Sequence, residues 1–291
     1  MPPPPTRTAG GEASPWCGFA YGLVAGNSSY GTSGTELSGT FGLARALAPS
    51  TSIGVSIGVA GLRNGLGYGG RFDAPGATFG TYFAHRPETG FQFLAMAVAS
   101  LYPDLTLTRG YLNGTTLAGS QGATHASSAG AMARIGWALA IPGAKATVTP
   151  FVQLSYVNAR VGGFVESGGP FPASISAFNA AATTLRVGSQ LRGVLTERIT
   201  VFGGLAWASN LRTDAPLVQG SLLAADCSGA APLTAFCGLS GLGPRLSRSW
   251  VEGNAGLRYE LAPGSAAMIS ANAASQNTLT YGLQVGYSRA F

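Results

Sequence analysis

The chain is poor in charge and has almost no lysine. Charged residues make up 10% of its 291 residues, whereas ordinary soluble domains carry roughly 25%. Lys145 is the only lysine among 17 basic residues, and the arginines are spread singly from Arg7 to Arg289. Proteins that bind nucleic acid gather their basic residues on one helix or stripe. The net charge of +6 therefore does not indicate a nucleic-acid partner, and we expect none.

Long apolar runs are also missing. The longest candidates, such as residues 91–101, are interrupted well before the roughly 18 consecutive apolar residues that a membrane helix needs. The chain is nevertheless apolar overall, with 46% hydrophobic residues and 44 glycines, which is too apolar for disorder. Little charge, much glycine and no spanning helix are together typical of a transmembrane β-barrel.

Cysteine and histidine are scarce. The chain has three cysteines and two histidines, and their spacing fits no zinc motif. We therefore expect no metal and no cofactor. Cys227 and Cys237 lie in a segment rich in Gly, Ala and Ser. They are either a disulfide that staples a loop in an oxidising compartment or two unpaired thiols.

From Pro15 onward, apolar and polar residues alternate with a period of two, the signature of strands with two different faces. In the last segment one face carries Leu279, Tyr281, Leu283, Val285, Tyr287 and Phe291. A soluble sandwich would carry charge on its outward face, but here the polar face is mostly Gly, Ser, Thr and Asn. We predict twelve strands, at 16–25, 33–46, 51–61, 76–85, 91–101, 125–140, 146–159, 176–194, 198–209, 248–261, 266–275 and 279–291.

The connections between these strands alternate in length. Short turns, such as 48–50 and 142–144, take every second place, and the longer connections are 62–75, 102–124, 160–175 and 210–247. Outer-membrane barrels have tight periplasmic turns and long outer loops. The sequence thus predicts an all-β fold, a transmembrane antiparallel up-and-down β-barrel of twelve strands over residues 15–291. We expect it in the bacterial outer membrane, with extracellular long loops and a periplasmic C-terminus.

The first residues differ from the rest. Residues 1–14 are rich in proline and are predicted to form an extended tether. They contain no apolar region of a signal peptide, which an outer-membrane protein needs. We therefore expect a mature or truncated piece behind an added Met, preceded by further sequence.

The polar face of the strands carries the charged candidates for function. Alternation points these side chains into the lumen: Arg134, Arg186, Arg192, Glu252, Arg258 and Glu260. Such residues would either hold a passing polypeptide through polar contacts or satisfy one another and stiffen the wall. The opposite face is predicted to carry an aromatic girdle at the lipid interface, formed by Trp16, Phe19, Tyr21, Trp137, Tyr156, Trp207, Tyr259, Tyr281 and Tyr287.

The chain ends in an aromatic residue on an alternating strand. Phe291 shares a face with Tyr287 and Val285, and Gly286 lies five positions before the end. This ending resembles the β-signal that the outer-membrane assembly machinery reads. We expect Val285, Gly286, Tyr287 and Phe291 to be needed for assembly.

Several local phrases carry a wider resemblance. They are SLYPDL at 100–105, RGYL at 109–112, TPFVQLSY at 149–156, FVESGGPFPA at 164–173, WVEGNAGLRY at 250–259 and GYSRAF at 286–291. In these phrases, in size and in strand number, residues 15–291 resemble the C-terminal translocator domain of autotransporters, which belong to type V secretion.

The resemblance implies a barrel that exports and anchors an N-terminal passenger, absent from this chain. Its partners would be outer-membrane lipid, the barrel assembly machinery and that passenger, and we expect a monomer from a Gram-negative bacterium. In the family, a helix before the first strand usually fills the pore. Here the prolines of residues 1–14 disfavour that helix, so the plug is missing or the lumen is blocked otherwise.

Two other classes of function fit parts of the sequence. A barrel without a passenger would be a passive pore or a surface-binding barrel, with residues 210–247 as its binding surface or as a lid. His125 and Ser127 share the outward face of a strand, a spacing that looks like that of outer-membrane phospholipase A, but no Asn lies nearby to orient the histidine. The four aspartates are scattered over loops and do not support proteolysis. We therefore expect no enzyme.

Overall fold

The computed structural model describes residues 15–29, 32–214, 216–223, 237–243, 247–276 and 279–291. Its strands are β1 (Trp16–Ser29), β2 (Thr32–Ala48), β3 (Thr51–Gly65), β4 (Arg71–His85), β5 (Gly90–Asn113), β6 (Thr116–Ala140), β7 (Ala146–Val161), β8 (Phe164–Val165), β9 (Ala173–Ile175), β10 (Phe178–Val194), β11 (Ile199–Asp214), β12 (Leu217–Leu222), β13 (Gly238–Leu242), β14 (Ser249–Ala262), β15 (Ser265–Ser275) and β16 (Leu279–Ala290). A short 3-10 helix, η1 (Gly67–Gly69), joins β3 to β4. Within the described ranges, no helix is long and apolar enough to span a membrane.

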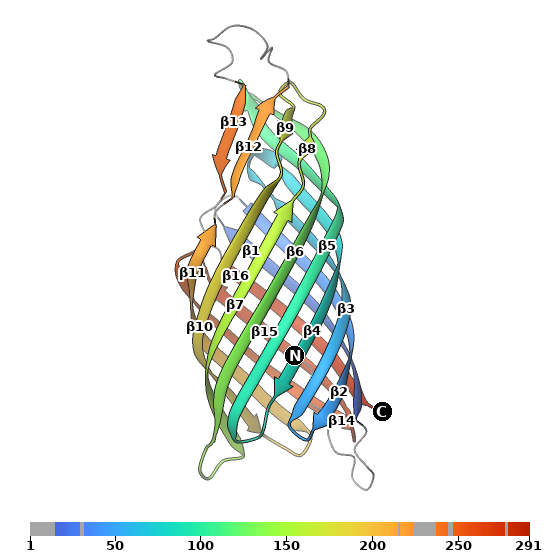
Figure 1. Ribbon diagram of the computed structural model, residues 1–291, viewed down its shortest axis with the longest axis vertical. Coiled ribbons are helices and arrows are strands. Elements are labelled where there is room, and N and C mark those ends of the chain that lie inside the picture. Colours follow the sequence, from blue (N-terminus) through green and yellow to red (C-terminus); the bar gives the residue numbers. More distant parts are fainter. Residues whose placement is uncertain (1–14, 30–31, 215, 224–236, 244–246, 277–278) are drawn as a thin grey trace.

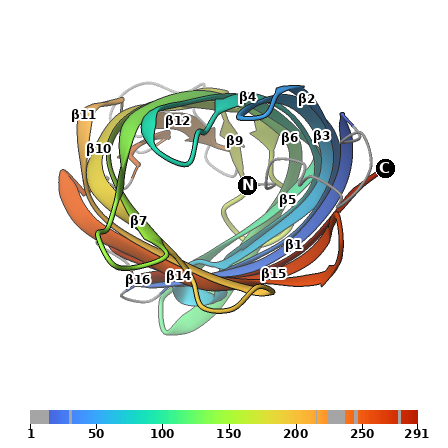
Figure 2. The same ribbon diagram turned by 90° about the horizontal axis from the view of Figure 1, so that it is seen from below.

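Twelve of these strands close into one antiparallel barrel. Their order around the wall is β1-β16-β15-β14-β11-β10-β7-β6-β5-β4-β3-β2, and the end view shows the closed ring (Figure 2). Each predicted strand overlaps one barrel strand, so the predicted twelve-stranded barrel is confirmed. The remaining strands form a separate sheet in the order β13-β12-β9-β8, which lies beyond one end of the barrel (Figure 1).

The first and last strands close the barrel. β1 pairs with β16 over twelve residue pairs, from Cys17 with Ala290 to Ser28 with Leu279. The backbone N–H of Phe291 donates to the carbonyl of Trp16 at 3.1 Å. Closure leaves no strand edge in the wall, and an unpaired edge is not tolerated in hydrocarbon.

The long connections are more structured than the sequence suggested. Residues 102–124 were predicted as a loop, but β5 and β6 run through them and meet at a two-residue turn where Gly114 has φ +64°. Pro103 and Asp104 lie in a β-bulge of β5, where the register with β6 shifts between Tyr102 and Leu105. Pro and Asp disfavour strands, so this bulge interrupted the sequence pattern while the hairpin continued. The loop prediction for this segment was wrong.

The other long connections also contain strands. β3 and β4 take up most of residues 62–75, while β8 and β9 lie within 160–175, and β12 and β13 within 210–247. Because successive strands are antiparallel, these connections lie at one end of the barrel, called here the hairpin end, together with the brief connections after β1 and β15. The turns after β2, β4, β6, β10 and β14 lie at the other end, called here the turn end (Figure 1).

Successive residues of the strands alternate between two faces of the wall. On β14 Leu257 is 42% exposed, whereas the side chain of its neighbour Arg258 is 15% exposed. The exposed outer face is apolar around the barrel, as in Phe41, Val59 and Leu205. This sorting suits lipid outside and a polar interior.

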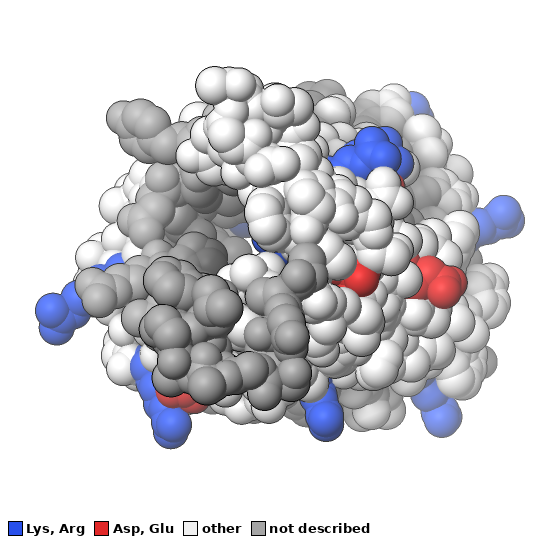
Figure 3. All heavy atoms as spheres, turned by 90° about the horizontal axis from the view of Figure 1, so that it is seen from above, with Lys and Arg blue, Asp and Glu red and all other residues white. Residues whose placement is uncertain are grey.

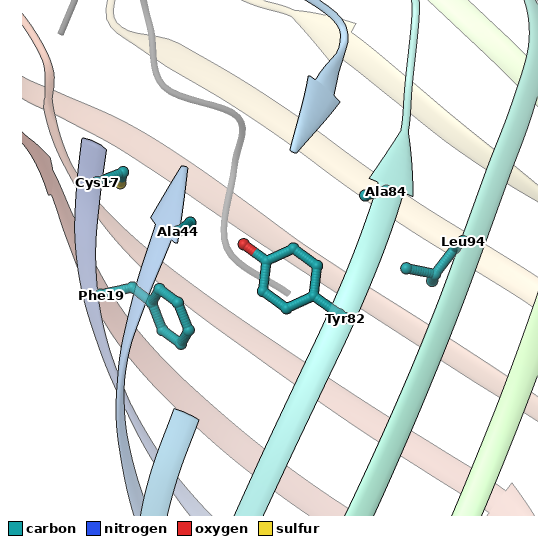
Figure 4. Close-up of a cluster of buried hydrophobic side chains, with 6 residues drawn as sticks. All are labelled: Cys17, Phe19, Ala44, Tyr82, Ala84 and Leu94. Atoms are coloured by element: carbon teal, nitrogen blue, oxygen red, sulfur yellow. The ribbon is translucent and has the colours of Figure 1, made fainter. Parts of the chain in front are cut away.

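Two members of the predicted aromatic girdle lie on the inner face instead. Phe19 is 7% exposed, and it packs with Tyr21 and Tyr82 at ring-centroid distances of 5.6 and 6.4 Å. Phe19 and Tyr82 form an apolar cluster near the turn end with Cys17, Ala44, Ala84 and Leu94 (Figure 4), and Tyr21 packs against this cluster. β1 is apolar on both faces, so its period could not reveal which side faces lipid. The outward assignment of Phe19 and Tyr21 was wrong.

Glycines make room for these rings. A Cβ at Gly42 would overlap the ring of Phe19, one at Gly54 would overlap that of Tyr82, and one at Gly286 would overlap that of Tyr21. Each pair lies on neighbouring strands, so the ring lies flat over the glycine of the next strand. Glycine here is a packing requirement of the inner face.

The substitution Gly54→Ala should destabilise the barrel by about 1–3 kcal/mol, because the added methyl forces the Tyr82 ring out of place. The measurement is the temperature at which the compact form converts to the unfolded band in gel electrophoresis without prior boiling. The matched control is Gly39→Ala, where the new Cβ would lie 4.0 Å from Cγ2 of Val59 and should change little. Equal midpoints for the two variants would contradict this packing.

Candidate functional site

An ion pair crosses the inner face of the wall. Nε of Arg186 on β10 lies 2.6 Å from Oε1 of Glu252 on β14, although β11 runs between these strands. The β11 residues opposite them are Ala208 and Ala206, which are 0% and 6% exposed. Because these side chains are small, the two long side chains meet above β11, on the concave side of the wall.

Further polar contacts extend this ion pair along the wall. Arg186 Nη1 donates to Oγ of Ser155 on β7 at 2.9 Å, and Nε1 of Trp250 donates to Glu252 Oε2 at 3.2 Å. Through Ser155 the network reaches β7 on one side, and it ends on β14 on the other. Ser155 and Trp250 carry no charge pattern that would have revealed them in the sequence.

Arg134 has a different environment. Its Nε donates to Oε1 of Gln153 at 3.0 Å, and its guanidinium carbon lies 4.0 Å from the ring centroid of Phe151. Gln153 and Phe151 both belong to β7, opposite β6. A ring below an arginine stabilises its charge. Arg134 is thus held by an amide and a ring, with no ion pair among the described residues.

The remaining predicted residues lie nearer the turn end. Arg258 Nη2 is 3.6 Å from Glu260 Oε1, a longer contact than that of Arg186. Nε of Arg258 is buried and has no hydrogen-bond partner. Arg192 is exposed and makes no ion pair within the described ranges. The structure therefore brings Arg186 to Glu252 and Arg258 to Glu260, and leaves Arg134 and Arg192 apart from these pairs.

A second polar cluster lies at the hairpin end, and the sequence reasoning did not identify it. Glu166 has a side chain that is 1% exposed, and Arg109 contacts both its oxygens, with Nη2 2.7 Å from Oε2. The backbone N–H of Ala173 donates to the same oxygen at 3.0 Å. A buried carboxylate is tolerated when it is paired and hydrogen-bonded in this way. This contact, called here the rim clasp, ties residues 164–173 to the β5–β6 hairpin.

Aromatic contacts complete the rim clasp. Arg109 lies 4.8 Å above the ring of Tyr111, and the backbone N–H of Phe171 donates to the Tyr111 hydroxyl at 3.1 Å. Gly169 has φ +68°, and a Cβ there would overlap the carbonyl of Gly119. Two of the phrases noted in the sequence, RGYL and FVESGGPFPA, contain the two halves of the clasp. Their proximity could have been read only from the fold.

The residues of the expected assembly signal lie on or directly after β16, where it pairs with β1; this junction is called here the seam. Val285, Tyr287 and Phe291 are 52%, 41% and 63% exposed on the outer face. Gly286 faces inward beneath the ring of Tyr21. The seam thus offers an apolar outer edge and a glycine at which even a Cβ would overlap the ring of Tyr21.

The other candidates from the sequence do not form a catalytic arrangement. His125 is exposed and has no hydrogen bond to Ser127 in the structure. Cys17 is free and buried, and Cys237 is disulfide-bonded, while its expected partner Cys227 lies outside the described residues. No group of His, Cys, Asp and Glu within the described part of the chain is arranged to hold a metal.

Comparison with known proteins identifies the family. The model of the autotransporter β-domain matches residues 18–272. The chain belongs to this family. Among curated proteins, none matches its sequence.

Solved autotransporter barrels share the fold. The translocator domain of the autotransporter NalP from Neisseria meningitidis is 12% identical, with a TM-score of 0.74 over 98% of this chain and 91% of that one. The β-domain of the Bordetella autotransporter BrkA is 16% identical, with a TM-score of 0.62 over 95% and 100%. The transport unit of AIDA-I from Escherichia coli is 12% identical, with a TM-score of 0.50 over 97% and 92%.

Family membership and the closed barrel together make this chain an integral outer-membrane translocator barrel of an autotransporter. Barrels of this kind are transport domains.

The substitution Glu252→Gln should lower the free energy of unfolding by about 1–2 kcal/mol, because it leaves the Arg186 guanidinium without its charged partner on a largely buried wall. Urea unfolding in lipid vesicles measures this. The control is Asp214→Asn, whose partner Arg212 and own side chain are 76% and 53% exposed, and which should cost less than about 0.5 kcal/mol. The double variant with Arg186→Gln should recover part of the loss. Equal losses at both sites would count against a structural role of the pair.

Proposed function

We propose that this barrel exports an N-terminal passenger through its lumen and keeps it anchored at the cell surface. The observation that carries the proposal is the inner wall, where Arg186 and Glu252 are held in an ion pair above Ala206 and Ala208. Long charged side chains that are tied along the wall do not project across the lumen. They present polar atoms that a passing chain contacts weakly, since paired charges attract less than free ones.

The position of the first strand supports passage through the interior. Pro15 lies at the turn end, where its carbonyl accepts from the backbone N–H of Ala46. A passenger joined before Pro15 therefore starts at the turn end. We place that end in the periplasm, as tight turns are in outer-membrane barrels. A passenger that reaches the outside must then run along the lumen to the hairpin end.

The outer surface supports the remaining partners of the proposal. Its apolar face contacts lipid, and Trp137, Tyr156 and Trp207 are among its exposed aromatic residues, the residues favoured at membrane interfaces. A closed wall leaves no strand edge for pairing with a second barrel, which supports a monomer as the working unit. The apolar edge formed by Val285, Tyr287 and Phe291 is the surface that the assembly machinery would recognise.

The decisive experiment fuses a signal peptide and a small reporter domain before Pro2 and treats intact cells with external protease. We expect the reporter to be cleaved while the barrel remains folded. The control is the same fusion carrying a disulfide-locked reporter, which should remain in the periplasm. A barrel that assembles normally and always leaves the unlocked reporter inside would reject export and favour a passive pore.

A second prediction concerns assembly. Deleting Phe291 removes the aromatic side chain at the outer seam and its backbone hydrogen bond to Trp16, so most of the chain should fail to reach the folded, membrane-inserted form. Phe291→Tyr keeps the ring and the backbone and serves as the matched control. The amount of heat-resistant barrel in outer-membrane fractions measures the effect. Normal amounts after the deletion would remove Phe291 from the assembly signal.

A further inference from the structure

The outer face of β7 changes from apolar to polar toward the hairpin end. Its outward residues Val152, Leu154 and Tyr156 are 42%, 48% and 47% exposed, as expected of a wall in contact with lipid. The next two residues on this face are Asn158 and Arg160, and Nδ2 of Asn158 donates to the Tyr156 hydroxyl at 3.3 Å. An aromatic residue followed by polar ones marks the boundary of the hydrocarbon. Arg160 therefore lies just beyond the lipid chains, at the level of the headgroups.

Polar side chains on the neighbouring strands flank Arg160. Its direct partner on β6 is Ser127, and its direct partner on β10 is Asn179. Residues directly opposite each other in an antiparallel sheet share a face, with Cβ atoms about 5 Å apart. A Cβ at Gly162, two residues after Arg160, would lie 2.7 Å from Cε1 of His125, so the imidazole borders the same surface. Arg160, Ser127, Asn179 and His125 are called here the Arg160 patch.

The polar groups of this patch are not used within the protein. In the ranges that the structure describes, the side chains of Arg160, Ser127 and Asn179 make no hydrogen bond and no ion pair. Arg160 and Asn179 are exposed, and Ser127 is half-buried between them and its own strand. The patch therefore offers a guanidinium, a hydroxyl and an amide to a ligand on the outside of the wall.

The described carboxylates nearest in strand order do not pair with Arg160. Asp104 lies in the bulge of β5 and Asp214 at the end of β11, so each is two strands away, on opposite sides. Strands are about 4.8 Å apart, so two strands correspond to about 10 Å. Asp214 is also bound by Arg212 at 3.2 Å, and Glu166 is held in the rim clasp. Arg160 thus presents its charge to the surroundings of the barrel.

The Arg160 patch continues the surface that contacts lipid. Viewed from the hairpin end, basic side chains project outward from the wall at several places around the barrel (Figure 3). A ligand that contacts both Leu154 and Arg160 must carry acyl chains and an anionic group in one molecule. A guanidinium binds phosphate oxygens through charge-assisted hydrogen bonds, while a serine hydroxyl and an asparagine amide both donate to and accept from sugar hydroxyls. A phosphorylated glycolipid combines all these groups.

We propose that the Arg160 patch binds the headgroup of a phosphorylated glycolipid in the outer leaflet, with a phosphate on Arg160 and sugar hydroxyls on Ser127 and Asn179. The outer leaflet of a Gram-negative outer membrane is rich in such a lipid. The placement of the hairpin end at this leaflet rests on the proposed function, which puts the turn end in the periplasm. The binding itself belongs to the outer wall and needs no passenger.

The experiment places the purified full chain in nanodiscs of phosphatidylcholine and adds diphosphorylated lipid A in increasing amounts. Native mass spectrometry counts the lipid A molecules retained on the barrel. We expect Arg160→Gln to weaken this binding about fivefold, the effect of one basic residue near an anionic lipid surface. Lipid A without its phosphates should bind more weakly to the unchanged chain, and Arg160→Gln should make no further difference to it.

The sugar contacts are tested with phosphatidylglycerol, which carries a phosphate and no sugar. The unchanged chain should bind it more weakly than lipid A. The double variant Ser127→Ala with Asn179→Ala should lose this preference, because Arg160 and its phosphate contact remain while the partners of the sugar hydroxyls are removed.

The matched control is Arg45→Gln. Arg45 is also exposed on the outer face, but at the turn end, where its guanidinium carbon lies 5.5 Å from the ring centroid of Trp16. Its loss removes the same charge and should leave the binding unchanged. Heat resistance of each variant on gels shows that the barrel is folded.

Four results would each overturn the proposal: equal binding of lipid A with and without its phosphates, unchanged binding after Arg160→Gln, an equal loss after Arg45→Gln, or equal binding of phosphatidylglycerol and lipid A by the unchanged chain. The measurement contains no passenger. Lipid binding can therefore fail while the reporter is exported, and export can fail while the lipid binds.

Discussion

The whole structure depends on one constraint: in hydrocarbon, every backbone N–H and C=O must be bonded within the chain. A chain without a spanning helix meets this requirement only by closing its sheet, and here closure occurs between β1 and β16 over twelve residue pairs. Phe291 continues the contact to Trp16 beyond the last pair. Each remaining feature of the barrel, from its outer apolar face to its polar interior, follows from this closed wall.

Closure also creates a concave inner face on which large side chains are crowded. Small residues lie beneath these side chains because a larger residue would overlap them. Gly54 admits the ring of Tyr82, and Ala206 and Ala208 admit the pair of Arg186 and Glu252. The same face therefore contains both an apolar cluster and an ion pair that spans β11.

The strands could be predicted from the sequence because lipid outside and water inside impose a strict period of two. The seam strand β16 follows this rule from Leu279 to Tyr287. β1 does not, because Phe19 and Tyr21 pack inside on Gly42 and Gly286, so their direction could not be read. The rim clasp and the contact across β11 were also unpredictable, since Arg109 and Glu166, like Arg186 and Glu252, meet only through strand order.

The central claim is that the passenger travels along the inner face of this wall. Gln190 and Leu191 are neighbours on β10, and Leu191 is 50% exposed on the outer face, whereas Gln190 faces inward. A photo-crosslinking residue placed at either position, in cells where a disulfide-locked passenger has stalled in the barrel, tests the claim directly. Crosslinks to the passenger from position 190 and none from position 191 are the predicted result. Crosslinks from position 191 alone, or from neither position while the passenger is stalled, would contradict it.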